Sequence, residues 1–334
     1  MGCRCGEEAA PSVRGAGHPA RATAKGAIVD NKRFSGVIPP VVVPLTQDRQ
    51  LDVPSFERNI NRMIEAGVDG LFILGSSSEV VFSTDERRTE IIENMVRIVD
   101  HRVPVLAGII DTETERMIEH GKRAEQMGVD ALVATCPFYA LQGINEIEWS
   151  FRCLHDALDL PIFAYDIPVC VHNKLDVDML IRLGVDGVLA GVKDSSGDDV
   201  SFRRLIIKNR DAGHPLQLLT GHEVVVDGAY LGGADGSVPG LANVEPYGYV
   251  RQWKAAQAGD WETVRDEQDR LARIMEITSV TSGVQGFGAG VGAFKTALKL
   301  MGIFETNQMP RPVHSLKGEN VEAIRRVLEE NGLL

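Results

Sequence analysis

Eight short apolar runs, separated by amphipathic stretches, constrain the fold of this chain more than any other feature of its sequence. Each run ends in polar residues or in a Gly/Pro cluster, a pattern typical of buried parallel strands. The stretches between them, such as Ser55–Ala66 and Thr114–Met127, carry apolar residues at helical spacing. The predicted strands are Val37–Thr46, Gly70–Ser76, Val103–Ile110, Ala131–Pro137, Pro161–Tyr165, Gly187–Lys193, Leu216–Thr220 and Gly236–Leu241.

A weak internal repeat marks the passage from helix to strand. It occurs at Ala66–Gly70, Met127–Ala131, Leu183–Gly187 and Gly232–Gly236. Each copy places a Gly where a helix needs a left-handed C-terminal cap, and an apolar strand then begins. Eight strand–helix units in roughly 220 residues fit a (β/α)₈ TIM barrel better than an open doubly wound sheet. We therefore expect an α/β fold of this kind.

The chain is longer than a bare barrel, and its pattern changes after the last predicted strand. We expect residues 34–258 to form the barrel and residues 259–334 to form a C-terminal helical extension. The segment Ser282–Gly292 holds five glycines and is too Gly-rich to be helical. Residues 1–33 lack periodicity and are expected to be a disordered leader without chemistry. The helices predicted after the last strand, which would include the eighth barrel helix as well as the extension, are Glu245–Ala258, Trp261–Thr278, Gly292–Met301 and Glu319–Glu330.

Composition and charge limit the classes of partner. With 44% hydrophobic residues the chain can bury a large core, and its net charge of −12 disfavours nucleic acid and anionic membranes. No apolar segment approaches the roughly 18 residues of a spanning helix, and the N-terminus lacks an apolar signal core. The five cysteines, at positions 3, 5, 136, 153 and 170, are odd in number and scattered. This usage predicts reduced thiols in a cytoplasmic protein.

Lys193 is the residue with the clearest chemical potential. It ends the apolar run that begins at Gly187 and is followed at once by Asp194. In a barrel the strand C-termini form the reactive face, so this amine is expected at the site, where it is a plausible nucleophile towards a carbonyl carbon. The alternative is an exposed charge or a salt-bridge partner of a residue such as Asp194.

A metal site is the other chemistry to consider. His172, His222 and Glu223 fall near predicted strand ends, but no H-x-H or H-x-x-x-H spacing brings them to a focus. We therefore predict no metal and no cofactor. A position at the mouth of the barrel or behind the site is preferred for His222 and Glu223.

Five segments at predicted strand ends carry a resemblance to a known family. In order and spacing they resemble the dihydrodipicolinate synthase / N-acetylneuraminate lyase family from about Gly36 to the C-terminus. Each motif is weak alone, but five of them at the strand ends of one barrel are jointly specific. The segments are Gly75–Glu79, Pro137–Tyr139, Tyr165–Pro168, Gly191–Asp194 and Gly233–Val238.

The resemblance implies class I aldolase chemistry on pyruvate or a related 2-oxo acid. Lys193 would form the Schiff base, and Tyr165 would shuttle protons in a relay with the hydroxyl of Ser76 and the phenol of Tyr139. The carboxylate of the 2-oxo acid would bind Ser76 and Ser77, and Val238 would line the pocket.

Each implied role has a structural alternative. Tyr139 could be a packing residue at the barrel mouth, and Ser76–Ser78 could be the N-cap cluster of a helix. Glu79, the last residue of the serine segment, is expected to be structural rather than catalytic.

One departure from the family pattern concerns the second substrate. In the family's synthases an arginine after the tyrosine strand binds the carboxylate of the aldehyde, and the matching position here is Cys170. His172, two residues on, could hydrogen-bond a hydroxyl or, when protonated, partly replace the arginine. The nucleophilic half of the site therefore looks intact, while the aldehyde pocket is rebuilt in this atypical member.

The sequence thus predicts a Schiff-base aldolase or lyase that makes or breaks a carbon–carbon bond between a 2-oxo acid and an aldehyde. The alternatives are a 4-hydroxy-tetrahydrodipicolinate synthase proper, a 2-keto-3-deoxy sugar acid aldolase or dehydratase, and a class II aldolase dependent on a divalent metal. A binding or regulatory protein for 2-oxo acids that does not turn over is the alternative outside enzymes. From the resemblance we expect a homotetramer or homodimer, with a subunit contact near Tyr139 that completes or braces the site.

Overall fold

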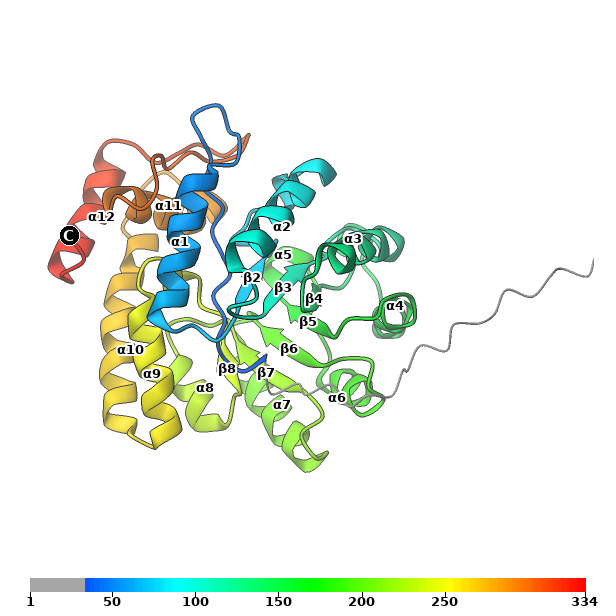
Figure 1. The fold of residues 1–334 in the computed structure, drawn as a ribbon. Helices are drawn as coiled ribbons and strands as arrows, with labels where there is room; N and C mark the ends of the chain where they lie inside the picture. The colour runs from blue at the N-terminus through cyan, green and yellow to red at the C-terminus, as the bar shows by residue number, and fades with distance from the viewer. Residues whose placement is uncertain (1–33) are drawn as a thin grey trace, which may run out of the picture. The chain divides into compact units, whose positions relative to one another are not determined.

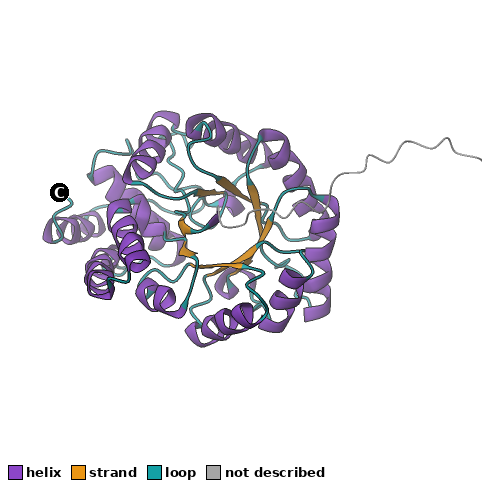
Figure 2. Cartoon of the chain, turned by 60° about the horizontal axis from the view of Figure 1, so that its bottom comes forward, coloured by secondary structure: helices purple, strands orange, loops and turns teal. Residues whose placement is uncertain are grey.

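The computed structural model describes residues 34–334, which lie within one compact unit. Its strands are parallel and form a ring that the helices surround, as seen along the barrel in Figure 2. The order around the sheet is β1-β8-β7-β6-β5-β4-β3-β2, so sequential strands are neighbours. The strands are β1 (Gly36–Val37), β2 (Leu71–Ile73), β3 (Val105–Gly108), β4 (Ala131–Ala134), β5 (Ile162–Asp166), β6 (Gly191–Asp194), β7 (Gln217–Thr220) and β8 (Gly236–Ser237).

The ring closes between β1 and β2 through a single parallel bridge, which joins Pro40 and Phe72. The amide of Val41 donates to the carbonyl of Phe72 at 2.8 Å, and the amide of Phe72 donates to the carbonyl of Pro39 at 2.9 Å. The first strand is much shorter than the predicted Val37–Thr46, because the prolines in this run have no N–H to donate to a ladder. The predicted TIM barrel is confirmed.

The helices follow the strands around the barrel and then continue into the C-terminal part (Figure 1). Helix α9 follows β8, α10 packs along α9, and α11 packs against α12. None of the helices in residues 34–334 has the length and apolar character of a membrane span. The helices are α1 (Val53–Ala66), α2 (Asp85–Val99), α3 (Thr114–Met127), α4 (Ile144–Ala157), α5 (Pro168–Val171), α6 (Val177–Val185), α7 (Asp199–Asp211), α8 (Val226–Gly232), α9 (Pro246–Ala258), α10 (Trp261–Met275), α11 (Gly290–Leu300) and α12 (Glu319–Glu330).

The helical extension was predicted with small errors at its ends. Helix α10 stops at Met275 and continues as a 3₁₀ turn over Glu276–Thr278. The segment Ser282–Gly292 is not free of helix as predicted, because it contains a 3₁₀ turn over Gly286–Gly288 and the start of α11 at Gly290. The division between barrel and extension at residues 258 and 259 stays a prediction, and the predicted leader at 1–33 lies outside the described residues.

The internal repeat has a structural reason in three of its four copies. Gly67, Gly128 and Gly233 are left-handed C-caps with φ of 93°, 87° and 102°. The Asp two residues later accepts the amide of the first or second residue of a strand: Asp69 accepts from Val37 at 2.8 Å. In the same way Asp130 accepts from Val105 at 2.9 Å, and Asp235 accepts from Leu218 at 2.7 Å.

The copy at Leu183–Gly187 differs, and the prediction of a Gly cap there is wrong. Gly184 lies inside α6, and the C-cap of this helix is Asp186, whose backbone is right-handed. A Cβ on Gly184 would come within 2.6 Å of the side chain of Leu216, so this glycine permits close packing of helix against strand. Asp186 pairs with Arg152 instead of bonding to a strand amide.

Candidate active site

Lys193 lies on β6, in the middle of the barrel sheet. The strand begins at Gly191 rather than at the predicted Gly187, and Asp194 rather than Lys193 is its last residue. The register places Lys193 beside Tyr165 on β5 and Leu219 on β7. Only 5% of Lys193 is exposed, so its amine is held inside the barrel.

Two aromatic rings surround the amine of Lys193. Its Nζ lies 4.1 Å from the ring centroid of Tyr165 and 4.9 Å from that of Phe72, and the two rings meet edge to face. Gly75 makes room for the second ring, because a Cβ there would come within 2.5 Å of Phe72. The aromatic faces can attract a cation electrostatically without forming an ion pair with it.

No carboxylate within residues 34–334 forms an ion pair with Lys193, whose contacts are the two rings. The candidate partner, Asp194, instead lies 3.7 Å from Nζ of Lys174 and accepts the amide and hydroxyl of Ser196. The structure therefore does not support the interpretation of Lys193 as a salt-bridge residue.

Ser76 and Tyr165 are brought together across the barrel mouth. Their hydroxyl oxygens are 3.5 Å apart, at the upper limit of a hydrogen bond. Ser76 stands in the turn after β2, where its carbonyl accepts the amide of Glu79 at 2.9 Å. Cys170 is an exposed residue of the short helix α5, close enough to Ser76 and Lys193 for both to affect its thiol. Desolvation raises the pKa of the Cys170 thiol, and the hydroxyl of Ser76 and the charge of Lys193 oppose that shift.

The other predicted members of the anion pocket take different positions. Ser77 is half-buried beside Ser76 in the same turn. Ser78 is buried and its hydroxyl donates to the carbonyl of Val41 at 2.6 Å, so the serine run anchors a turn and does not cap a helix through its side chains. Val238 is buried just after β8, and its amide donates to the carbonyl of Thr220 at 2.7 Å.

Two predicted site residues do not join this group. Tyr139 is 89% exposed and makes no hydrogen bond with Ser76 or Tyr165 among the described residues. His172 is exposed at the end of α5 and caps that helix with a left-handed backbone (φ 59°). A single chain therefore assembles Lys193, Tyr165, Ser76 and Cys170, but leaves Tyr139 and His172 outside.

A cluster of two buried acidic residues, Asp166 and Asp194, directly follows Tyr165 and Lys193 in the chain. Asp166, fully buried at the end of β5, accepts a hydrogen bond from Lys174 and another from the amide of Leu175. Burial raises the pKa of Asp166 to about 6, Lys174 opposes the shift, and the nearby Asp194 adds to it. The cluster fixes the ends of the two strands that carry Tyr165 and Lys193.

Glu223 is the carboxylate that follows β7. It accepts a hydrogen bond from the amide of Leu241 at 2.7 Å. Burial raises its pKa, and hydrogen bonds and the charge of Lys193 oppose that shift. His222 is instead paired with Asp199 at 3.1 Å, away from Glu223. Residues 34–334 contain no group of three His, Cys, Asp or Glu side chains that could hold a metal ion. His172, His222 and Glu223 therefore do not converge.

A buried ion pair anchors the turn that carries Ser76. Nζ of Lys295, fully buried on α11, lies 2.5 Å from Oε2 of Glu79 and 3.2 Å from the carbonyl of Gln308. Glu79 has a left-handed backbone (φ 56°) and its Oε1 has no partner in the described residues. Burial raises the pKa of Glu79 and lowers that of Lys295, and the attraction between the two charges opposes both shifts.

Sequence reasoning missed Phe72, the Asp166–Lys174 pair and Lys295. Phe72 could not be singled out, because the sequence of a strand that is buried on both faces does not show which side chains point into the barrel. Lys295 had a visible signal, since it is the one charged residue in the otherwise apolar segment Val291–Leu298. A lone charge in a buried helix requires a partner, although the sequence does not say which one.

Comparison with known proteins agrees with this architecture. The model of the dihydrodipicolinate synthetase family matches residues 33–331, which is most of the chain. A 4-hydroxy-tetrahydrodipicolinate synthase from Phenylobacterium zucineum is 32% identical over 243 residues, covering 72% of this chain and 81% of that protein. An uncharacterized DapA-like lyase from Halobacterium salinarum is 31% identical over 300 residues, covering 90% and 94%.

Solved structures show the same fold. YagE, a prophage protein of the dihydrodipicolinic acid synthase family from E. coli K12 in complex with pyruvate, superposes with a TM-score of 0.85 at 28% identity and covers 90% of this chain and 99% of that one. The dihydrodipicolinate synthase from Bacteroides thetaiotaomicron gives a TM-score of 0.83 at 32% identity, covering 89% and 98%. This chain thus belongs to the dihydrodipicolinate synthetase family and is a lyase, as the resemblance of its motifs predicted.

Proposed function

We propose that this protein is a Schiff-base class I aldolase or lyase that acts on pyruvate or a related 2-oxo acid and an aldehyde. The observation that carries the proposal is the amine of Lys193, which is buried between two aromatic rings without a carboxylate partner in residues 34–334. Burying a lysine without an ion-pair partner costs stability, and a use of its amine in chemistry would explain why it is there.

In this proposal Lys193 attacks the ketone carbon of the 2-oxo acid and water leaves, which gives an iminium. The iminium accepts the electron pair of a C–H bond on the adjacent carbon as its proton departs, and the resulting enamine attacks the aldehyde carbon. The aldehyde oxygen takes up a proton, and water then releases the product and restores the amine. Cleavage is the same sequence in reverse.

Tyr165 is the proposed proton carrier. Its hydroxyl lies 3.5 Å from that of Ser76, and its ring lies against the amine at 4.1 Å, so it can exchange protons beside the reacting carbons. The carboxylate of the 2-oxo acid would bind Ser76 and Ser77 in the turn after β2. Val238, buried after β8, would also line the pocket.

We further propose that the aldehyde has an uncharged, hydroxylated tail. Cys170 occupies the position where the family's synthases carry an arginine, and its thiol cannot make a bidentate contact with a carboxylate. Glu223, within the electrostatic range of Lys193, would repel a second carboxylate when ionised and can hydrogen-bond a hydroxyl. A tail of the 2-keto-3-deoxy sugar acid kind fits this arrangement better than aspartate semialdehyde.

Borohydride trapping tests the Schiff base. With pyruvate present, reduction should add a stable adduct to Lys193 and inactivate the enzyme. Lys295 is an internal control, because it is equally buried but is paired with Glu79, and it should stay unlabelled in peptide maps. Absence of an adduct at Lys193, or loss of activity with EDTA, would refute the proposal.

The tail is tested by measuring kcat/KM with pyruvate fixed and the aldehyde varied, in the wild type and in Cys170→Arg. The lost charge-assisted contact is worth roughly 1.5–3 kcal/mol, so aspartate semialdehyde should be about tenfold to a few hundredfold worse than a hydroxylated aldehyde, and the arginine should reduce the difference. Efficient use of aspartate semialdehyde by the wild type, with no gain in the variant, would favour a synthase proper. An adduct without turnover of any aldehyde would favour a binding protein.

We also propose a cytoplasmic homodimer or homotetramer. The exposed aromatic side chain of Tyr139 at 89%, followed by Leu141 at 65%, supports a subunit contact on this loop. A second copy would be needed for Tyr139 to join Tyr165, or for its loop to be braced. Light scattering at micromolar concentration should give an even-numbered oligomer, and Tyr139→Ala together with Leu141→Ala should weaken it. A monomeric wild type would contradict this.

A further inference from the structure

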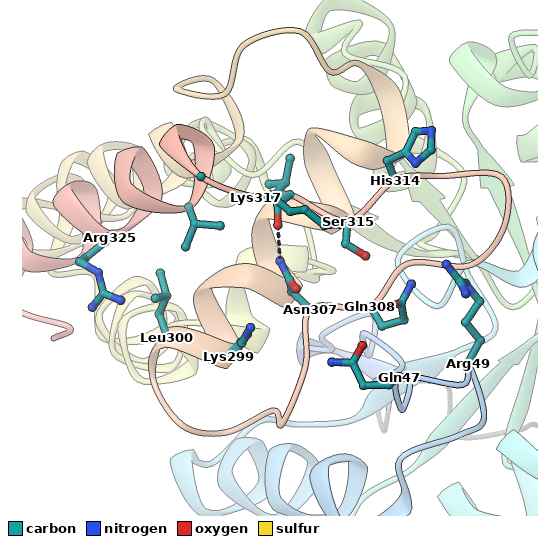
Figure 3. A pocket seen from close by; sticks show the side chains of 13 residues that line it. Gln47, Arg49, Lys299, Leu300, Asn307, Gln308, His314, Ser315, Lys317 and Arg325 are labelled. Carbon is teal, nitrogen blue, oxygen red and sulfur yellow. Dashed lines mark hydrogen bonds between the residues drawn. The ribbon is translucent and has the colours of Figure 1, made fainter.

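A cavity of about 740 Å³ lies outside the barrel site, between the loop after β1 and the C-terminal helices. Figure 3 shows Gln47 and Arg49 on one side, Lys299 and Leu300 near the end of α11, and Lys317 and Arg325 on the segment that leads into α12 and on α12 itself. A cavity of this size is in the range that holds small organic ligands. The other lining residues are Asn307, Gln308, His314, Ser315, Leu316, Gly318 and Val321.

The charge of this cavity is opposite to that of the protein. Arg49, Lys299, His314, Lys317 and Arg325 line it and no Asp or Glu does, although the whole chain has a net charge of −12. Of these bases only Arg325 has a carboxylate within 4 Å in the described residues, the exposed Glu322 on its own helix at 3.3 Å. Like charges gathered without counter-charges repel one another, and an anion relieves that repulsion.

Arg49 is held in place by the backbone around it. It has a left-handed conformation (φ 62°), which is unfavourable for a residue with a side chain. Its Nε donates to the carbonyl of Met309 at 3.1 Å, and its own carbonyl accepts from Arg87 at 3.2 Å. Only Nε of this guanidinium has a hydrogen bond within residues 34–334, so its two terminal nitrogens are free to bind an oxyanion.

Neutral side chains, some polar and some apolar, complete the lining of the cavity. The hydroxyl oxygen of Ser315 accepts the amide of Met309 at 3.0 Å, so its proton is available to donate. Asn307 donates to the carbonyl of Leu316 at 2.9 Å, which fixes the segment that bears Lys317. Leu300 and Val321 supply apolar contact beside the bases.

We propose that this cavity is a second binding site, for a small organic anion that carries two or more negative charges. Polyphosphates and polycarboxylates share this chemistry. Pyruvate, with one charge and little bulk, would not occupy it at concentrations that saturate Lys193. Lys299 alone would not support the proposal, because a lysine in the last turn of a helix is also favoured by the helix dipole. The support comes from five bases on three separate segments around one cavity.

Isothermal titration with inorganic tripolyphosphate and, separately, with citrate tests the proposal. Each is titrated against the whole protein at matched ionic strength in sodium chloride. At least one should bind saturably with Kd below about 1 mM, and affinity should fall as salt rises. At a concentration of about 100 Kd the ligand should raise Tm by about 4 °C. The anion that binds more tightly shows whether the natural ligand is a polyphosphate or a polycarboxylate.

The variant Lys299→Gln/Lys317→Gln should weaken binding at least about tenfold. Both side chains are exposed, so the fold should tolerate the change. The matched control is Lys122→Gln/Lys254→Gln, which removes the same two charges from exposed positions elsewhere and should bind as the wild type does. Absence of saturable binding with both probes, or equal loss in the two double variants, would overturn the proposal.

Discussion

Breaking the buried pair of Glu79 and Lys295 should be among the most damaging single changes outside the reacting groups. Lys295→Met fills a similar volume but leaves the carboxylate of Glu79 buried at 4% exposure, with Oε1 already unpartnered. Removing one member of such a pair costs about 3–5 kcal/mol, because an uncompensated charge remains. With a melting entropy of about 2.1 cal/mol/K per residue over roughly 300 residues, the loss corresponds to about 5–8 °C in Tm.

Differential scanning calorimetry on four variants measures this effect: Lys295→Met, Glu79→Gln, the double variant and a control. Lys299→Met, one turn further along α11 and exposed, is the matched control and should change Tm by no more than about 1 °C. Lys295→Met/Glu79→Gln removes both charges and should recover part of the loss. A fall of less than about 2 °C in Lys295→Met, or a double variant as unstable as the sum of the two single variants, would refute the reasoning.

The same variant should also lower activity at temperatures where it is fully folded. Glu79 closes the turn in which its amide donates to the carbonyl of Ser76 at 2.9 Å. Without Lys295 the turn loses its anchor to α11, so the 3.5 Å contact between Ser76 and Tyr165 should become less frequent. We expect a fall in kcat of about tenfold, with borohydride labelling of Lys193 retained. Unchanged kcat would show that the pair serves stability alone.

Three further predictions concern single residues. Tyr165→Phe should lower kcat by about two or more orders of magnitude while leaving pyruvate binding detectable by titration, and an unchanged kcat would reduce the tyrosine to a packing role. Asp166 has a pKa raised to about 6 from an ordinary 3.8. Between these values the folded state binds more protons than the unfolded state. The contribution of Asp166 to the stability of the folded state is therefore lost as pH rises through 6. Asp166→Asn should therefore flatten the fall in Tm between pH 3.8 and about 6, the window set by the two pKa values, and parallel curves for variant and wild type would contradict this. Gly108→Ala should cost several kcal/mol or prevent folding, because the new Cβ would lie 2.0 Å from the carbonyl oxygen of Leu74, and a Tm within about 2 °C of the wild type would show that the backbone yields there.

The barrel could be predicted from the sequence because each of its units is local. A short apolar run, a helix of period 3.6 and a glycine cap such as Gly67 repeat along the chain, and each needs only its neighbours in sequence. The failure at Gly184 has a non-local cause. Gly184 has the sequence signature of a cap, but the packing of Leu216 against it decided its role, and that contact joins separate segments.

The placement of polar side chains at the strand ends was predictable for the same reason. In a barrel every strand C-terminus lies on one face, so the order of the motifs was enough to bring Lys193, Tyr165 and Ser76 together. What surrounds them was not predictable, because the choice of inward-facing residue on a doubly buried strand is made by the register. The ring of Phe72 lies against Lys193 only because the strand pairing turns it that way.

Long-range polar pairs are the least accessible to sequence reasoning. Glu79 and Lys295 are 216 residues apart, and neither residue alone indicates the other. Lys295 alone was visible, as the one charge in the segment Val291–Leu298, because Glu79 follows three serines. A buried charge is expensive unless it is paired, so a buried ammonium indicates that an anion lies beside it without saying which one. Lys193 is the exception to this rule: it is buried, it forms no ion pair with a carboxylate in the described residues, and the Schiff-base reaction proposed for its amine would account for its position.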